Sequence, residues 1–255
     1  MKLIASITSP FVRKVRVLIH EAGKTNEVEE LMVATTPFAT DSSVIAANPL
    51  GKIPALIRDS GPALYDSRVI TRYLDAEWNL GLYPTDRRWD VLTLEATADA
   101  ILEAAVAIVY EARMRPAEFQ YPDWVEAQWA KIDRALTAVE ERWVSNLLGP
   151  LDMGQIAMGV ALSYVDFRLG DRNWRATRPE LAKWHADFAA RKSMTDTVPE
   201  YGLERVAKAN VQRVGDQVEL NVTAVVQIDV LLAVGELIFT KHGPSIAQVI
   251  FCTCV

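Results

Sequence analysis

The sequence predicts a protein of the α/β plus all-α class, in which a small mixed domain precedes a helical one. Short strand-like and helix-like segments alternate over residues 1–78. Over residues 89–200, apolar residues recur at steps of three and four, which is the period of an α-helix. Residues 79–88 contain Gly81 and Pro84, and we interpret them as a linker.

The first domain is expected to follow the order βαβ and then ββα, a small α/β sandwich. Pro10 suits the first turn of a helix, where its missing N–H costs nothing, and Gly23 suits the end of that helix. Residues 59–62 are a turn sequence that joins two strands into a hairpin. Asp66 or Ser67 is the expected N-cap of the second helix. The expected strands are 2–7, 27–33, 53–58 and 63–65, and the expected helices are 10–22 and 66–78.

The second domain is expected to be helical throughout. Apolar stripes with helical spacing run through residues 91–108 and 129–143. Asp152, followed three residues later by Gln155, resembles a capping box, in which two side chains satisfy free backbone donors at a helix start. The helix that follows places four apolar or aromatic residues on one face: Ile156, Val160, Tyr164 and Phe167.

The tail, residues 201–255, has a different pattern. Every even-numbered residue from Val218 to Val234 is apolar, and a two-residue period predicts one long strand over 217–234. A helical domain offers such a strand no evident partner. We assign the tail no role.

Composition excludes several classes of protein. The net charge is −6, with no excess of basic residues of the kind that binds nucleic acid. The only cysteines are Cys252 and Cys254, so the body of the chain predicts no disulfide, no redox pair and no thiolate metal site. The three histidines are scattered, and we expect no metal. No signal peptide or membrane span is evident, which favours a cytoplasmic protein.

Five motifs stand out over residues 1–199. They are Thr8-Ser9-Pro10-Phe11-Val12-Arg13-Lys14, Asn48-Pro49-Leu50-Gly51-Lys52-Ile53-Pro54, Tyr65-Asp66-Ser67, Tyr164-Val165-Asp166-Phe167-Arg168, and the stretch from Trp174 through Arg178-Pro179-Glu180-Leu181 to Trp184. In sequence and in order these motifs resemble a known family, the glutathione transferases of serine type, especially small bacterial ones and plant tau-class ones.

This resemblance implies a thioredoxin-like domain followed by a helical bundle, assembled as a homodimer. It also implies a detoxification enzyme in which the thiolate of glutathione attacks a small hydrophobic electrophile. Ser9 would donate a hydrogen bond to that thiolate from the start of a helix, whose dipole adds to the effect. Lowering the pKa of a thiol by about two units takes about 2.7 kcal/mol. One charge-assisted hydrogen bond supplies about 1.5–3 kcal/mol.

The resemblance also assigns the rest of the site. The glutathione-binding residues would be Phe11, Lys52, Ile53, Pro54, Asp66 and Ser67, with a cis bond before Pro54 that presents the Ile53 backbone to the cysteinyl part. Lys52 would meet the glycyl carboxylate, and Asp66 and Ser67 would hold the γ-glutamyl end. Asp66 stands where the family usually has the longer Glu. Tyr110, Arg113 and Met114 are candidates for the second-substrate pocket.

Each assignment has a plainer alternative. Ser9 and Asp66 with Ser67 could simply cap helices, Pro54 could be trans, Lys52 could be solvated, and the second-substrate candidates could be ordinary helix surface or core. For the whole chain, a glutathione-dependent peroxidase or dehalogenase is a variant within the enzyme class. The alternative from another class is a non-catalytic glutathione- or ligand-binding module with the same fold. Retention on a glutathione resin tests whether the chain binds glutathione.

Overall fold

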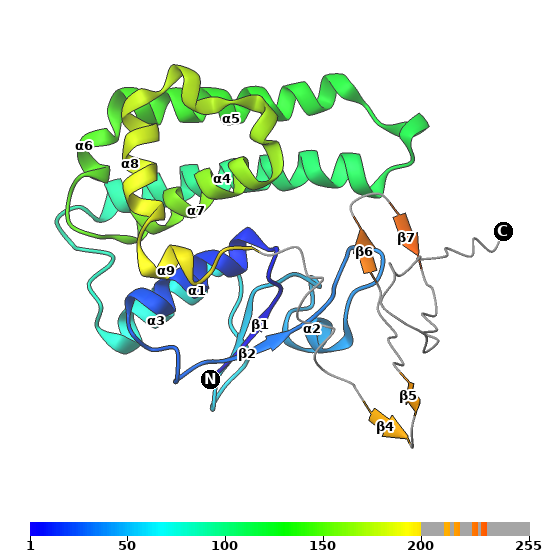
Figure 1. Cartoon of the computed structure of the whole chain (residues 1–255). Coiled ribbons are helices and arrows are strands. Elements are labelled where there is room, and N and C mark those ends of the chain that lie inside the picture. Colours follow the sequence, from blue (N-terminus) through cyan, green and yellow to red (C-terminus); the bar gives the residue numbers. More distant parts are fainter. Residues whose placement is uncertain (200–211, 215–216, 220–225, 229–230, 234–255) are drawn as a thin grey trace. The chain divides into compact units, whose positions relative to one another are not determined.

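The computed structural model describes residues 1–199 and four short strands beyond them, at 212–214, 217–219, 226–228 and 231–233. The chain divides into two units, Met1–Pro199 and Glu200–Val255. The first unit has a small sheet with helices beside it and a bundle of helices above it (Figure 1). This arrangement confirms the predicted α/β plus all-α class.

The sheet of the first unit has three strands in the order β2-β1-β3. They are β1 (Lys2–Ala5), β2 (Glu29–Met32) and β3 (Ala55–Ile57). β1 runs parallel to β2 and antiparallel to β3, with Ile4 opposite Ala55. Leu56 and Leu64 exchange two backbone hydrogen bonds of 2.9 Å, so the hairpin predicted here is present in a shorter form.

Two of the helices beside the sheet were predicted and one was not. They are α1 (Pro10–Glu21), α2 (Ser42–Ala47) and α3 (Ser67–Trp78). Asp41 caps the unpredicted helix α2 by accepting the Ser43 N–H at 2.8 Å. A helix of six residues is too short to show a clear apolar period, which explains why α2 escaped the sequence analysis.

The helical part begins with α4, which packs along α5 and α7. α7 is buried along most of its length, so it is apolar on all sides rather than on one face. Among the described residues, no helix has both the length and the apolar character needed to cross a membrane. The helices are α4 (Arg88–Met114), α5 (Pro122–Arg142), α6 (Val144–Leu147), α7 (Met153–Leu169), α8 (Pro179–Ala189) and α9 (Lys192–Thr195), with 3-10 turns at Ala117–Phe119, Gly170–Arg172 and Trp174–Thr177.

The start of α7 has half of the predicted capping box. Asp152 accepts the backbone N–H of Gln155 at 3.0 Å, as an N-cap does. The Gln155 side chain does not reach back to Asp152. It donates instead to the carbonyls of Asn146, Gly149 and Pro150, the shortest of these bonds being 2.8 Å to Pro150. Gln155 therefore fixes the turn that leads into α7.

The described tail strands form two antiparallel pairs, β4 (Gln212–Val214) with β5 (Gln217–Glu219) and β6 (Val226–Ile228) with β7 (Leu231–Ala233). The single long strand predicted over 217–234 is therefore wrong, because the chain reverses direction between β6 and β7. A two-residue period indicates extended backbone, but it does not indicate where that backbone turns. The sequence between β6 and β7 also has no Gly, Pro or Asn, the residues that usually indicate a tight turn. The other residues of that prediction lie outside the described part.

His185 on α8 is 3% exposed and lies in a hydrogen-bonded cluster with α7. Its Nδ1 faces Arg175 Nη2 at 2.7 Å, so Nδ1 is the acceptor and the ring proton sits on Nε2. Nε2 then donates to Ser163 Oγ at 2.9 Å, and that hydroxyl donates to the Gly159 carbonyl. In a catalytic pair the serine hydroxyl donates its hydrogen bond to the histidine, whereas here the histidine donates to the serine. The cluster is structural.

Lowering the pH is expected to destabilise the fold through His185. Burial, together with Arg175 and Arg13, outweighs Asp166 and lowers its pKa from 6.5 to about 4. Between pH 6.5 and about pH 4, His185 is protonated in the unfolded chain but stays neutral in the folded one. The free energy of unfolding therefore decreases as the pH is lowered through this range. Between pH 6.5 and 5 the wild type is expected to lose about 2 kcal/mol more than His185→Gln, measured by urea unfolding. Equal losses would contradict this assignment.

Gly159 is expected to be essential for the contact between α7 and α8. A Cβ added here would overlap the Phe188 ring. Gly159→Ala is therefore expected to destabilise the protein by about 1–3 kcal/mol through overpacking, measured by urea unfolding. Gly170→Ala is the matched control, because a Cβ at Gly170 meets no described atom within 4 Å. A loss as large in the control would contradict the packing argument.

Candidate functional site

The register of the sheet brings three predicted site segments to the same end of the strands. Ile4, near the end of β1, pairs with Ala55, at the start of β3. The loop that leads from β1 to Ser9 therefore lies beside the Ile53–Pro54 segment that leads into β3. Leu64 pairs antiparallel with Leu56, so the chain runs from Leu64 toward this same end before α3 begins.

Ser9 is the N-cap of α1 and is half-buried. Its hydroxyl oxygen accepts the backbone N–H of Val12 at 3.4 Å. A hydroxyl has one proton to donate besides its acceptor sites, so capping leaves the Ser9 proton available. Phe11 lies in the first turn of the same helix and packs against the main hydrophobic core.

The Ile53–Pro54 peptide bond is cis, as predicted. Within residues 1–199, the backbone N–H and C=O of Ile53 form no hydrogen bond. Such groups offer strand-like pairing to an extended ligand. Lys52 is exposed, and its carbonyl accepts from the Asn48 side chain at 2.8 Å.

Asp66, Ser67 and Arg68 form the start of α3. Asp66 caps the helix by accepting the Arg68 N–H at 3.0 Å, and it also pairs with the Arg68 guanidinium at 2.7 Å. Partial burial acts to raise the pKa of Asp66, but the hydrogen bond and charge of Arg68 outweigh it and lower the pKa, so Asp66 is an anion at neutral pH. Ser67 is buried, and its hydroxyl makes no hydrogen bond within residues 1–199.

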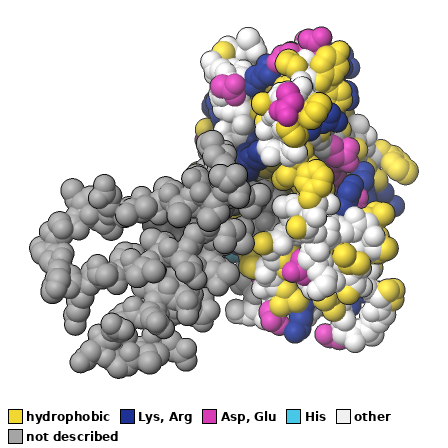
Figure 2. Space-filling view, turned by 90° about the vertical axis from the view of Figure 1, so that its right-hand side faces the viewer, with side chains coloured by type: hydrophobic (Ala, Val, Ile, Leu, Met, Phe, Trp, Pro, Cys, Tyr) yellow, Lys and Arg dark blue, Asp and Glu magenta, His cyan; other side chains and the backbone are white. Residues whose placement is uncertain are grey.

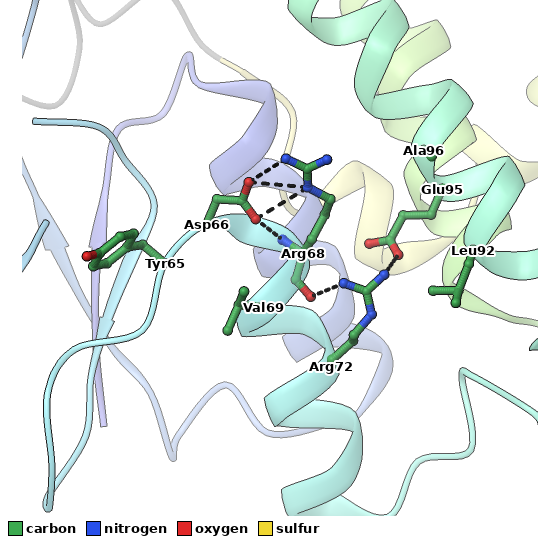
Figure 3. A pocket seen from close by; sticks show the side chains of 8 residues that line it. All are labelled: Tyr65, Asp66, Arg68, Val69, Arg72, Leu92, Glu95 and Ala96. Carbon is green, nitrogen blue, oxygen red and sulfur yellow. Dashed lines mark hydrogen bonds and ion pairs between the residues drawn. The ribbon is translucent and has the colours of Figure 1, made fainter. Parts of the chain in front are cut away.

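A cavity of about 520 Å³ lies between α3 and α4 and includes this helix start. Asp66 and Arg68 pair at one end of it, and Arg72 pairs with Glu95 at the other, with an Nη2–Oε2 distance of 3.3 Å (Figure 3). The remaining lining residues are Tyr65, Val69, Leu92 and Ala96. Because each end holds one cation and one anion, the cavity wall suits a ligand that carries both charges.

Behind this cavity lies a buried ionic network centred on Lys14 of α1. Lys14 is 0% exposed, and its ammonium donates to both carboxylate oxygens of Asp99 at 2.7 and 2.9 Å and to Glu95 at 3.3 Å. Asp99 Oδ2 also lies 3.9 Å from the Arg68 Nε atom. A buried ammonium needs such partners, because an uncompensated charge inside a protein is very costly.

Tyr83 completes the network from the segment between α3 and α4. Its hydroxyl lies 3.1 Å from both carboxylate oxygens of Glu95 and 2.9 Å from Thr71 Oγ1. Burial, reinforced by the charge of Glu95, raises the pKa of Tyr83, so the hydroxyl keeps its proton and donates it. Burial also raises the pKa of Glu95 against the opposing charge of Lys14.

The second-substrate candidates lie at the C-terminal end of α4. Tyr110 is 41% exposed, Arg113 is exposed and Met114 is half-buried. α4 packs along α7, where burial raises the pKa of Tyr164 and the charge of Arg113 opposes that rise. Within residues 1–199, no hydrogen bond or ion pair joins any of the three to Ser9.

The sequence analysis missed Lys14, Arg68, Arg72, Glu95 and Asp99. One signal was present, because Glu95 and Asp99 lie four residues apart within the apolar stripe of α4. Acidic side chains are rarely buried unless they are paired, so two of them on a buried helix face indicate a buried cation nearby. Nothing local identifies Lys14 as that cation, since it is more than 80 residues away in the chain.

Comparisons with known proteins agree with this architecture. Residues 8–77 match the glutathione S-transferase N-terminal domain, and residues 122–187 match the C-terminal domain. The chain is 35% identical over 206 residues to the uncharacterized GST-like protein YibF of Escherichia coli K12, covering 78% of this chain and 98% of that one.

Two solved bacterial relatives carry glutathione. A glutathione transferase family member from Pseudomonas fluorescens Pf-5, with bound glutathione, is 41% identical, with a TM-score of 0.75 over 78% of this chain and 98% of that one. A glutathione S-transferase from Methylobacillus flagellatus KT, also with glutathione bound, is 36% identical, with a TM-score of 0.68 over 78% and 99%. With these matches and a sheet and helical bundle of the same design, the chain belongs to the glutathione transferase family.

Proposed function

We propose that this chain is a serine-type glutathione transferase that conjugates glutathione to small electrophiles, with Ser9 stabilising the thiolate. The observation that carries this proposal is the Ser9 hydroxyl. It stands half-buried at the start of α1 and caps that helix as an acceptor, so it still has a proton to donate. A sulfur anion at this position would gain that hydrogen bond and the positive end of the helix dipole.

The surrounding segments support glutathione as the ligand. The Ile53 backbone offers one donor and one acceptor to the cysteinyl part, as a strand would. At the start of α3, Asp66 suits the ammonium of the γ-glutamyl end. Ser67, with its backbone N–H at a helix start, suits the carboxylate of that end. Lys52 is exposed and suits the glycyl carboxylate.

Relatives support the same ligand class. The Pseudomonas fluorescens protein has been seen with glutathione and, in a second structure at 40% identity to this chain, with S-(propanoic acid)-glutathione. The second ligand has a substituent on sulfur, as a conjugation product does. The family resemblance further supports a homodimer in which this chain acts on hydrophobic electrophiles.

A second candidate function is a glutathione-binding module without catalysis. Its support is the uncharacterized status of the E. coli relative, together with the reuse of folds for different functions. The two candidates differ in whether Ser9 lowers the pKa of the bound thiol.

Ser9→Ala is expected to bind glutathione but to raise the pKa of its thiol by about two units, because one charge-assisted hydrogen bond is lost. The ultraviolet absorbance of the bound thiolate, followed against pH, measures this pKa. Turnover of 1-chloro-2,4-dinitrobenzene at pH 6.5 is expected to fall by about 100-fold for the same reason.

Ser9→Asp is the matched control for the helix cap. Aspartate caps a helix as well as serine does, but its negative charge disfavours a neighbouring thiolate. The alanine and aspartate variants are both expected to lose activity, although only alanine loses the cap. An active Ser9→Asp enzyme would show that capping is the whole role of Ser9.

Asp66→Asn is expected to weaken glutathione binding about tenfold, or about 1.4 kcal/mol, because the γ-glutamyl ammonium loses an anion while the helix cap is kept. Isothermal titration calorimetry measures the Kd. Asp123→Asn, an exposed carboxylate in the first turn of α5, is the control and is expected to leave the Kd unchanged. A Kd within twofold of wild type for Asp66→Asn would remove Asp66 from the site.

A further inference from the structure

The first turn of α1 holds the Ser9 hydroxyl only weakly. The hydrogen bond that this hydroxyl accepts from the Val12 N–H is 3.4 Å long, beyond the usual range of about 2.7–3.2 Å. The backbone tie is shorter, because the Ser9 carbonyl accepts the Arg13 N–H at 3.0 Å. Helix ends also fray, since the first N–H groups have no partner within the helix. A contact from outside α1 would therefore add order to this turn.

The side chain of Arg13 makes such a contact. It is 7% exposed and lies in the turn that Ser9 caps. Its Nη2 donates to the Met194 carbonyl at 3.0 Å, and its Nε lies 3.5 Å from Thr197 Oγ1, the longer of the two contacts. Both acceptors are more than 180 residues further along the chain. A planar guanidinium held at two of its nitrogens is fixed in orientation as well as in position.

The segment that receives Arg13 is buried and internally bonded. Met194 is 1% exposed and Thr197 is 0% exposed. The Thr197 hydroxyl donates to the Ser193 carbonyl at 2.7 Å, so its lone pairs remain to accept from Arg13. The Met194 carbonyl lies in the last residues of α9, where carbonyls lack partners within the helix and basic side chains often bind them. Residues 194–197 therefore offer a fixed pair of acceptors.

A second connection joins α1 to α9 at the opposite end of α1. The Arg191 guanidinium donates to the two Glu21 carboxylate oxygens at 2.8 and 2.7 Å. α9 packs beside α1 between these two connections (Figure 1). Only the Arg13 connection lies in the turn that carries Ser9, whereas Glu21 is the last residue of α1. The two arginines can therefore be compared as one connection near the candidate site and one far from it.

The Arg13 contacts persist over the pH range in which a thiol titrates. Burial, together with the charge of Arg16, lowers the pKa of Arg13 to about 10, so the guanidinium is a cation below that pH. Its acceptors within residues 1–199 are a carbonyl and a hydroxyl, and neither changes its charge near neutral pH. A free thiol, with a pKa of about 8.5, therefore titrates while the contacts stay formed.

The direction of the Ser9 hydroxyl matters more than the general field of the surface. On the face seen in Figure 2, Lys and Arg side chains are interspersed with Asp and Glu side chains, so neither sign of charge dominates there. A thiolate at α1 would depend mainly on the nearest donor. A hydrogen bond weakens steeply as its donor angle falls toward about 120°, so a tilt of the first turn would reduce the stabilisation that Ser9 gives.

We propose that Arg13 is a positioning residue of the candidate site, which directs the Ser9 hydroxyl at the glutathione sulfur by tying the first turn of α1 to Met194 and Thr197. The inference rests on the proposed transferase function. In this role Arg13 does not touch the sulfur and acts only through Ser9. The last turn of the helical part thereby contributes to chemistry that takes place beside the sheet.

Arg13→Met removes both donors and keeps the length of the side chain for packing. In the full chain, the pKa of the bound glutathione thiol is expected to rise by about one unit, half the rise expected for Ser9→Ala, because the Ser9 bond is misdirected rather than lost. The ultraviolet absorbance of the thiolate measures it. The kcat/KM for 1-chloro-2,4-dinitrobenzene is expected to fall about tenfold at pH 6.5 and to approach that of wild type at pH 8.5, where the thiol ionises in both.

Two further measurements separate positioning from a general loss of structure. The Kd of S-methylglutathione, which has no thiol to ionise, is expected to stay within about twofold of wild type in Arg13→Met. Arg13→Lys keeps a long cationic donor and is expected to restore at least half of the lost thiol pKa shift. Arg13→Gln is too short to reach Met194 and is expected to behave as Arg13→Met does, so it tests the inference even if Arg13→Met fails to fold.

Arg191→Met is the matched control, because it removes the other connection between α1 and the end of the helical part. Its bound thiol is expected to keep the pKa of wild type, whatever stability the variant loses. An equal rise in the thiol pKa for Arg191→Met and Arg13→Met would overturn the inference, since the effect would then come from loosening α1 as a whole. An unchanged thiol pKa in Arg13→Met would overturn it as well.

A double variant separates this inference from the proposed function. If Arg13 acts through Ser9, then Ser9→Ala with Arg13→Met is expected to show the same thiol pKa as Ser9→Ala alone. A further rise in the double variant would show that Arg13 acts without Ser9, which overturns the inference and leaves the transferase intact. A wild-type protein that binds glutathione with the thiol pKa of the free tripeptide would instead overturn the proposed function of Ser9.

Discussion

The Lys14 ammonium, fully buried between α1 and α4, is the constraint on which the arrangement of residues 1–199 depends. Its partners Asp99 and Glu95 are also almost fully buried, so none of the three charges can be left alone without a large desolvation cost. Hydrophobic contacts alone would let α1 slide along α4, because apolar burial has no direction. The ion pairs fix the register of the two helices. An ion pair likewise fixes the position of α3 along α4, because Arg72 of α3 donates to Glu95 of α4.

This network also links the two ends of the candidate glutathione site. Lys14 lies on the helix that Ser9 caps. From Lys14 the contacts run to Asp99, then to Arg68 at 3.9 Å, and then to Asp66 at the start of α3. The helix that would hold the sulfur and the helix that would hold the γ-glutamyl end are thus held against the same carboxylate. A displacement of α4 would change the distance between those two ends, so the helical part contributes to a site that is built mainly on the sheet.

Sequence analysis recovered what local patterns determine. The strand at β1, the helix with Pro10 in its first turn and the cap at Asp66 follow from residues close in the chain. The cis bond before Pro54 follows from the family resemblance and not from a local pattern. Long-range pairs could not be recovered, because no local period shows which distant charge is the partner. For the candidate site, the family resemblance proposes Asp66 and Ser67 but not Arg68, which pairs with Asp66.

Charge also shapes the start of α3. Arg68 pairs with Asp66 and Arg72 pairs with Glu95, so each arginine on this side of the helix is balanced by a carboxylate. Glutathione carries one ammonium and two carboxylates, so a γ-glutamyl end bound here would be better matched by paired charges such as Asp66 with Arg68 than by a basic patch. A chain of net charge −6 can therefore offer both signs of charge at one helix start without a general excess of basic residues.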